Sequence, residues 1–216
     1  MTFQENTWSG KFGKEYNTRN DYTFDDLNDT YQGIFGHSRS DMNQAFLADL
    51  PRDIMILEVG CNFGGQLVQL QKMGFNNLYG LELQWDAIER AKKRTKEIHI
   101  IQGSGFNVPF LNNYFDLVFT SDVLIHISPD DIDKIMGEMV RVSNKYIWGF
   151  EYFNEEYIEV PYRNNQNLLW KGNYAGMFLD KNPELSIIKE EIYKRNSEDV
   201  KDKMYLLCCN ASHTLI

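Results

Sequence analysis

An acid and a set of closely spaced glycines stand at the end of an apolar run, in ILEVGCNFGG (56–65). The set reads Glu58, Gly60, Asn62, Gly64 and Gly65. Glycine is favoured where a chain turns with positive φ or where a ligand approaches the backbone, and asparagine tolerates the same left-handed conformation. Two phosphate-binding patterns fit poorly: Asn62 stands where the dinucleotide fingerprint has its middle glycine, and no lysine follows Gly65 as a P-loop requires. An acid ahead of the turn would repel a diphosphate, so we expect a cofactor with a positively charged group.

Polar residues also end three further apolar segments. These residues are Glu82, Gly103 with Ser104, and Ser121. Ligands of open α/β sheets bind at the carboxyl ends of the parallel strands, so the segment ends are expected to meet. Glu82 follows Glu58 at about the spacing of a carboxylate that binds ribose hydroxyls. Gly103, Ser104 and Ser121 are then expected at the same edge of the sheet as Glu82.

Apolar runs alternate with amphipathic helical segments between residues 51 and 150. The predicted strands are 54–59, 77–83, 98–102, 115–120 and 145–151, and the predicted helices are 64–73, 85–97 and 129–142. Continuous apolar strands separated by helices indicate a parallel sheet covered on both faces. Two further strands, 185–194 and 203–209, are expected to pair at its edge. The predicted fold class is α/β: a doubly wound, mostly parallel, seven-stranded sheet with antiparallel C-terminal edge strands.

The chain is expected to form one domain, residues 1–216, with four parts. They are an N-terminal helical cap (1–50), a cofactor-binding core (51–150), a substrate or lid segment (151–183) and a C-terminal β-hairpin (184–216). In the cap, Ser40 is expected to begin a helix over 40–50. Trp8, Phe12 and Tyr16 recur at helical spacing and predict a packing stripe.

The composition fits a globular protein whose partner is a small molecule. The 216 residues carry a net charge of −9, which disfavours nucleic acids and anionic membranes as partners. Three cysteines without a C-x-x-C suit a reducing compartment, and the N-terminus lacks signal-peptide features. We therefore expect a cytoplasmic protein without a metal site. The sequence indicates no oligomeric state.

Several motifs together resemble a known family. The acid-glycine turn and FDLVFTSDVLIHI (115–127) resemble class I S-adenosylmethionine-dependent methyltransferases, which have a Rossmann-like fold. TWSGKFGKEYNTRN (7–20) and EYFNEEYIEVPYRNNQNLLWKGNYAGMFLD (151–180) further resemble the bacterial pseudaminic acid biosynthesis-associated methylases. The resemblance implies S-adenosylmethionine as cofactor and a small-molecule acceptor, with a hydroxyl of a nonulosonic acid sugar as the candidate. It also implies that the cofactor is bound by Tyr16, Arg19, Glu58, Gly60, Asn62, Gly64, Glu82, Gly103, Ser104 and Ser121.

Methyl transfer to a hydroxyl or an ammonium needs a base, whereas a carboxylate acceptor needs none. His126 is the first candidate because its unperturbed pKa lies near 6.5. Glu151 and Tyr152, at the end of the fifth strand, are the next candidates. In the cap, Arg19 shares a helical face with Tyr16 and could hold a carboxylate in a fork.

The segment after the fifth strand offers contacts for an acceptor. Tyr162 and Arg163 are predicted to bind an anionic group of the acceptor. Alternatively, Arg163 pairs on the surface with one of the acids Glu155, Glu156 or Glu159. Two other functions stay open: an enzyme that cyclises or cleaves the cofactor's methionine chain, and a dinucleotide oxidoreductase or non-catalytic binding protein of the same fold.

Overall fold

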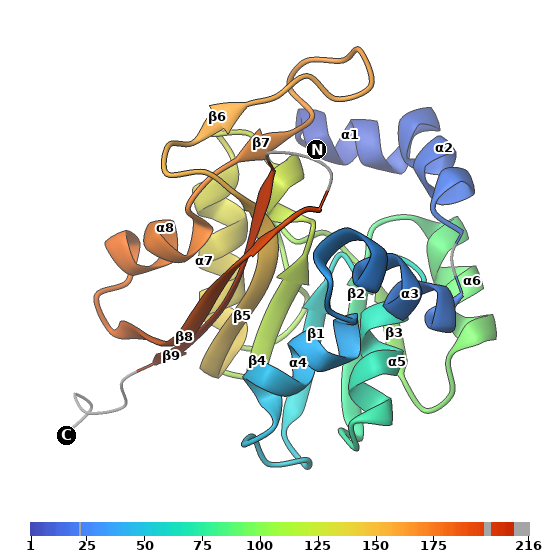
Figure 1. Cartoon of the computed structure of the whole chain (residues 1–216). Coiled ribbons are helices and arrows are strands. Elements are labelled where there is room, and N and C mark those ends of the chain that lie inside the picture. Colours follow the sequence, from blue (N-terminus) through green and yellow to red (C-terminus); the bar gives the residue numbers. More distant parts are fainter. Residues whose placement is uncertain (22, 197–199, 210–216) are drawn as a thin grey trace.

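A seven-stranded sheet forms the centre of the computed structural model, which describes residues 1–21, 23–196 and 200–209 (Figure 1). The strand order is β3-β2-β1-β4-β5-β9-β8. The parallel strands are β1 (Met55–Val59), β2 (Asn77–Glu82), β3 (His99–Gln102), β4 (Phe115–Ser121) and β5 (Ser143–Phe153). β8 (Leu185–Lys194) and β9 (Lys201–Cys209) pair antiparallel at the edge. The predicted fold class is therefore confirmed.

Helices cover both faces of the sheet because the strand residues alternate between two apolar clusters. Ile56 of β1 packs in one cluster with side chains of α3 (Phe24–Phe35), α4 (Arg39–Leu47), α5 (Gly65–Lys72) and α6 (Trp85–Arg94). Leu57 and Val59 pack in the other cluster with α7 (Ile132–Val142) and α8 (Tyr174–Lys181). The strand order reverses between β1 and β4, and ligands bind at such a switch point.

Smaller elements close the end of the sheet where the parallel strands finish. α1 (Phe3–Ser9) and α2 (Lys11–Arg19) lie at that end, as does the ribbon of β6 (Ile158–Glu159) and β7 (Trp170–Lys171) (Figure 1). A single 3-10 turn, η1 (Leu124–His126), follows β4. The strand ends thus face a roof made from both the N-terminal cap and the segment after β5.

The N-terminal cap differs from its prediction in two ways. The hydroxyl of Ser38, not that of Ser40, accepts the N–H of Asp41 and begins α4, whereas Ser40 bonds to side chains of the neighbouring helices α3 and α5. The predicted stripe of Trp8, Phe12 and Tyr16 spans two helices because the chain leaves the helical conformation at Gly10. The rings still meet across that break.

Candidate active site

A cavity of about 380 Å³ lies where β1, β2 and β4 end, beneath α1 and α2. Among the predicted site residues, those that line it are Tyr16, Glu58, Gly60, Asn62, Glu82, Gly103, Ser104, Ser121 and His126. Those that do not line it are Arg19, Gly64, Glu151, Tyr152, Tyr162 and Arg163. The structure thus brings together residues from four separate strand ends, as the topology predicts.

The glycine turn after β1 adopts the left-handed conformation that its residues permit. Gly60, Asn62 and Gly64 have φ values of 76°, 46° and 77°. The N–H groups of Gly60 and Cys61 both donate to the Leu81 carbonyl, which ties the turn to β2. A Cβ at Gly60 would lie 2.7 Å from Cγ2 of Val123, so the close approach of β4 also requires glycine there.

Glu82 ends β2 with a buried carboxylate that faces the turn. Its Oε2 accepts the N–H of Asn62 at 2.9 Å, and its Oε1 accepts the N–H of Gln84 at 2.8 Å. Burial raises the pKa of Glu82, and hydrogen bonds from the backbone of Gln84, Asn62 and Leu83 oppose that shift. A carboxylate has about four lone-pair sites, so these bonds leave acceptor capacity for donors in the cavity.

Glu58 lies deeper, on β1 below the turn. Its side chain is buried, and its Oε2 has no hydrogen-bond partner among the described residues. Burial raises the pKa of Glu58, and the buried guanidinium of Arg39 acts in the other direction. A buried carboxylate oxygen without a donor is costly, so this position favours a ligand that brings a donor or a positive charge.

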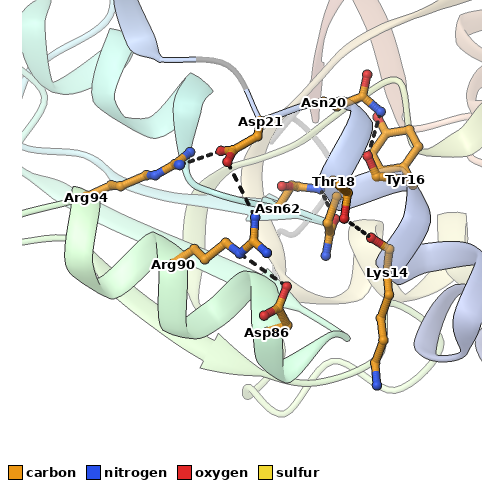
Figure 2. A network of polar contacts seen from close by, with 10 residues as sticks. Lys14, Tyr16, Thr18, Asn20, Asp21, Asn62, Asp86, Arg90 and Arg94 are labelled. Atoms are coloured by element: carbon orange, nitrogen blue, oxygen red, sulfur yellow. Dashed lines mark hydrogen bonds and ion pairs between the residues drawn. The ribbon is translucent and has the colours of Figure 1, made fainter.

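Polar contacts fasten the N-terminal cap to the turn. The buried Asn17 of α2 donates from Nδ2 to Oε1 of Gln84 at 3.1 Å, and its Oδ1 accepts from Nδ2 of Asn62 at 3.0 Å. Figure 2 shows Asn62 between Thr18 of α2 on the right and Arg90 of α6 on the lower left. The α1–α2 pair therefore acts as a roof bonded to the cofactor turn.

A second attachment lies just after α2. The carboxylate of Asp21 forms ion pairs with Arg94 and, at 3.6 Å, with Arg90, which also pairs with Asp86 at 3.2 Å (Figure 2). Both guanidinium groups lie over the ring of Phe63, which lines the cavity. The cap is thus held to α6 by charge as well as by hydrogen bonds.

Comparison with known proteins identifies the central part of the chain. Residues 57–145 match the model of a family described as a methyltransferase domain. This part of the chain is therefore similar to a methyltransferase domain. Its glycine turn and Glu82 fall within the matched range, and so does the end of β4.

Sequence relatives extend over part of the chain. An mRNA cap guanine-N(7) methyltransferase from Schizosaccharomyces pombe is 25% identical over 139 residues, which cover 64% of this chain and 34% of the relative. Norajmaline N-methyltransferase from Rauvolfia serpentina is 27% identical over 94 residues, which cover 41% of this chain and 32% of the relative. The chain thus spans about a third of the length of these curated relatives.

A solved structure shows the same fold over nearly the whole chain. The magnesium protoporphyrin IX methyltransferase from Synechocystis PCC 6803, with bound S-adenosylmethionine, has a TM-score of 0.67 and 14% identity. The similarity covers 96% of this chain and 98% of that one. The parts outside residues 57–145, including the α1–α2 roof, therefore belong to the methyltransferase fold as well.

The residues of the site fit this cofactor. Glu82 has lone pairs left for the ribose hydroxyls, and Glu58 has a buried oxygen free to accept a hydrogen bond from the ammonium. Gly103 and Ser104 line the side of the cavity near Phe106 and Ile135, where an adenine would meet apolar surface. Glu5 of α1, which the sequence analysis did not select, hydrogen-bonds Ser104 and lines the cavity there.

His126 lies in η1 with its ring enclosed by the roof. Its Nδ1 donates to the carbonyl of Leu168 at 2.7 Å, because a carbonyl can only accept, and Nε2 is left as the lone-pair nitrogen. The ring centroid lies 4.4 Å from that of Trp8 and 5.4 Å from that of Tyr162. Burial lowers the pKa of His126 to about 4, so the imidazole is neutral but a weaker base than its unperturbed pKa suggested.

The other predicted bases lie behind the strand ends. The buried carboxylate of Glu151 accepts the N–H groups of Val123 and Ile125, each at 3.3 Å, and so holds the η1 turn in place. Burial raises its pKa to about 8. The ring of Tyr152 packs against the guanidinium of Arg195 at 4.4 Å. In this structure Glu151 supports the position of His126 and Tyr152 faces the β8–β9 side, whereas neither lines the cavity.

The two residues predicted to bind the acceptor, Tyr162 and Arg163, have different surroundings. The ring of Tyr162 approaches His126 and, at 6.1 Å, Phe12, so it joins the roof. Arg163 is exposed with φ 51°, and its guanidinium lies 5.8 Å from the Tyr162 ring. No ion pair with Glu155, Glu156 or Glu159 occurs among the described residues. Arg19 lies over the Phe12 ring at 5.9 Å, with Nε and Nη2 buried and unpartnered within the described part of the chain.

Other kinds of site are not found in the part of the chain that the structure describes. No group of three histidine, cysteine or acidic side chains could hold a metal ion there. None of the described helices has the length and apolarity needed to cross a bilayer.

Proposed function

We propose that the protein transfers a methyl group from S-adenosylmethionine to a small-molecule acceptor bound in the same cavity. When bound, the cofactor supplies an electrophilic methyl group on its sulfonium. The residues of the chain bind and orient the two reactants and exclude water, which accounts for most of the catalysis of such a displacement. The observation that carries the proposal is the Glu82 carboxylate, buried beside a left-handed glycine turn with lone pairs left for hydroxyl donors.

The proposed cofactor-binding residues include two groups from the roof. Tyr16 lines the cavity, and Arg19 follows one turn later on α2. The unpartnered Nε and Nη2 of Arg19 form a fork that suits the methionine carboxylate, and Asn20, the next residue along the chain, lines the cavity. The remaining proposed contacts are those that the turn and the strand ends supply: Glu58, Gly60, Asn62, Gly64, Glu82, Gly103, Ser104 and Ser121.

The acceptor is proposed to be a small molecule because the cavity has a volume of about 380 Å³ and is covered on one side by residues of the α1–α2 roof. The relatives named above act, by their names, on the nitrogen of an mRNA cap and on norajmaline. A hydroxyl of a nonulosonic acid sugar, which the resemblance of the terminal segments suggests, stays a candidate, with Tyr162 and the exposed Arg163 as contacts for its carboxylate. Cyclisation or cleavage of the methionine chain is the alternative, and it predicts turnover without any acceptor.

The test is calorimetry with S-adenosylmethionine, S-adenosylhomocysteine and NADH. We expect binding of the first two and none of NADH. Glu82→Gln should weaken cofactor binding by about 1.5–3 kcal/mol, the range for hydrogen bonds to a charged group. The amide would also turn a donor toward one of the two N–H groups that Glu82 now accepts. The matched control is Glu89→Gln, an exposed position on α6. Tighter binding of NADH, or equal affinity of Glu82→Gln and wild type, would contradict the proposal.

A further inference from the structure

The end of β4 brings a carboxylate to the cavity that the proposed cofactor contacts do not use. Asp122 follows Ser121 directly, lines the cavity and has a left-handed backbone with φ 55°. Its N–H donates to the carbonyl of Phe150 at 2.9 Å, so β5 holds this conformation. Its Oδ1 is buried and has no hydrogen-bond partner among the described residues. Because the terminal torsion of aspartate is soft, a small rotation can present this oxygen to a ligand.

Aromatic rings and a lone-pair nitrogen line the same cavity. The rings are those of Trp8 and Tyr16 in the roof and Tyr31 in α3, and all three line it. The neutral imidazole of His126 adds Nε2 as a hydrogen-bond acceptor. Aromatic faces attract cations, and carboxylate and imidazole lone pairs accept N–H groups. These groups are therefore suited to a ligand that donates hydrogen bonds and carries positive charge.

The charged residues that line the cavity also favour a ligand that carries positive charge. Among the described residues that line the cavity, Glu5, Glu58, Glu82 and Asp122 are acidic, and none is lysine or arginine. The cations Arg39 and Arg195 act on Asp122 from α4 and from the β8–β9 edge without lining the cavity. An anionic acceptor would therefore meet acidic oxygens and no cation in the lining, whereas an ammonium would meet hydrogen-bond acceptors and the carboxylate of Asp122.

We propose that the methyl acceptor is an amine, bound through its N–H groups to the carboxylate of Asp122 and to Nε2 of His126. This inference rests on the proposed methyl transfer and specifies the substrate class of the same cavity. It makes Asp122 the proton acceptor of the reaction and His126 an orienting contact.

The step balances in atoms and charge. The ammonium form of the acceptor gives one proton to the Asp122 carboxylate, which leaves a lone pair on the nitrogen. That lone pair forms the new N–C bond while the methyl C–S bond breaks and its electron pair goes to sulfur. The positive charge thus passes from sulfur to the methylated nitrogen, and Asp122 then releases its proton to solvent.

The basicity of the two groups agrees with these roles. Burial raises the pKa of Asp122 to about 7, with Asp202 adding to the shift and Arg39, Arg195 and Tyr31 opposing it. A general base is most effective when its pKa lies near the working pH. His126, with a pKa of about 4, stays neutral and accepts a hydrogen bond without taking the proton.

The test compares amines with matched alcohols and acids on the protein loaded with S-adenosylhomocysteine. Suitable triplets are tryptamine, tryptophol and indole-3-acetate, and the corresponding phenyl and cyclohexyl compounds. At about pH 8, above the pKa of Asp122 and below that of an alkylammonium, we expect the amine of at least one triplet to bind about 10- to 100-fold more tightly than its alcohol. The acid should bind most weakly. Calorimetry measures the three dissociation constants.

Asp122→Asn should remove this preference. Asparagine adopts the left-handed conformation as readily as aspartate, so the fold and the affinity for S-adenosylhomocysteine should persist. The matched control is Asp133→Asn, a surface carboxylate that pairs with Lys181, and it should leave the preference unchanged. The inference is overturned if no amine binds better than its alcohol, or if Asp122→Asn keeps the preference. Both outcomes leave the proposed function standing, whereas failure to bind S-adenosylhomocysteine would reject that function first.

Discussion

At the scale of single residues, surroundings give four carboxylates different roles. Glu82 accepts two backbone N–H groups and faces the cavity, whereas Glu151 accepts two N–H groups of η1 behind it. Glu58 and Asp122 each keep one buried oxygen without a donor among the described residues. A satisfied carboxylate holds a structure, and an unsatisfied one is completed by a ligand. The chemistry of this site therefore depends on hydrogen bonds that residue type alone does not reveal.

The stability of the protein should report the buried state of His126. Its pKa is about 4 in the folded protein and near 6.5 when unfolded, so the unfolded state binds more protons between these values. Stability should consequently fall as the pH drops from 6.5 toward 4, by about 2–3 kcal/mol at pH 4.5 from this residue alone. In His126→Asn, whose amide can still donate to the Leu168 carbonyl, this loss should disappear.

Urea unfolding of both proteins near pH 7 and near pH 4.5 checks this prediction. Comparison with the variant is needed because Glu151, with a pKa raised to about 8, contributes with the opposite sign: its stabilisation is lost as the pH rises from 4.5 through 8. The difference between wild type and variant isolates the histidine. An equal loss of stability in the two proteins would show that His126 titrates normally.

The sequence predicts the local part of the site better than the part that packing decides. The turn at Gly60 and the position of Glu82 follow from residue types and spacing along the chain. The low pKa of His126 depends on Trp8 and Tyr162, which come from distant segments. The sequence does not predict Asp122 as a site residue, because neither its left-handed backbone nor its place in the cavity lining follows from its type.

At the scale of elements, the helices and strands of the core can be predicted from the sequence because their apolar residues recur with a clear helical or strand period. The N-terminal region is different, since α1 and α2 have only 7 and 9 residues and depend on their contacts for stability. Both capping boxes of this region were legible, Thr2 with Glu5 and Thr23 with Asp26, and would have given the starts of α1 and α3. These capping boxes do not indicate where the short helices pack on the rest of the molecule.

The docking of α2 should depend on one glycine. A Cβ at Gly13 would lie 1.8 Å from the carbonyl oxygen of Trp8 and 2.9 Å from Cδ of Gln84. Because the first contact is to backbone, Gly13→Ala should displace α1 from α2 and break the Asn17–Gln84 bond. We expect cofactor affinity to fall by about tenfold or more, as when a hydrogen-bonded contact is lost. The thermal unfolding midpoint of the protein should change little.

Gly33→Ala is the matched control because a Cβ at Gly33 meets no atom within 4 Å. Gly33 lies inside α3, where alanine favours the helix by about 1 kcal/mol, so this variant should be slightly more stable with unchanged cofactor affinity. Calorimetry and thermal unfolding separate the two effects. A Gly13→Ala protein with wild-type affinity would show that the roof is not needed to hold the cofactor.

At the scale of the whole molecule, two distant parts of the chain meet beside the cavity. The α1–α2 roof comes from the N-terminus, and Tyr162 comes from the segment after β5. The ring of Trp8 contacts the rings of Phe12 and His126, and the ring of Phe12 contacts that of Tyr162. Because residues of α1 and α2 line the cavity, we expect movement of the roof to influence how fast the cofactor is released.

The rate of cofactor release should therefore depend on the ion pairs that hold the roof to α6. Asp21 is the carboxylate that faces both Arg90 and Arg94 (Figure 2). These side chains are between 31% and 41% exposed, so the pairs are worth about 0.2–1 kcal/mol each. Asp21→Asn should then speed the release of S-adenosylhomocysteine by about 2- to 5-fold. Stopped-flow displacement at low and high ionic strength measures this rate.

Salt screens exposed charges, so release from wild type should quicken with salt while release from Asp21→Asn stays nearly constant. Asp133→Asn removes an exposed ion pair with Lys181 of α8 that does not involve Asp21, and it should behave as wild type. If Asp21→Asn releases the ligand at the wild-type rate and with the same salt dependence, the cofactor leaves by another opening, and the loop that carries Tyr162 becomes the part that moves.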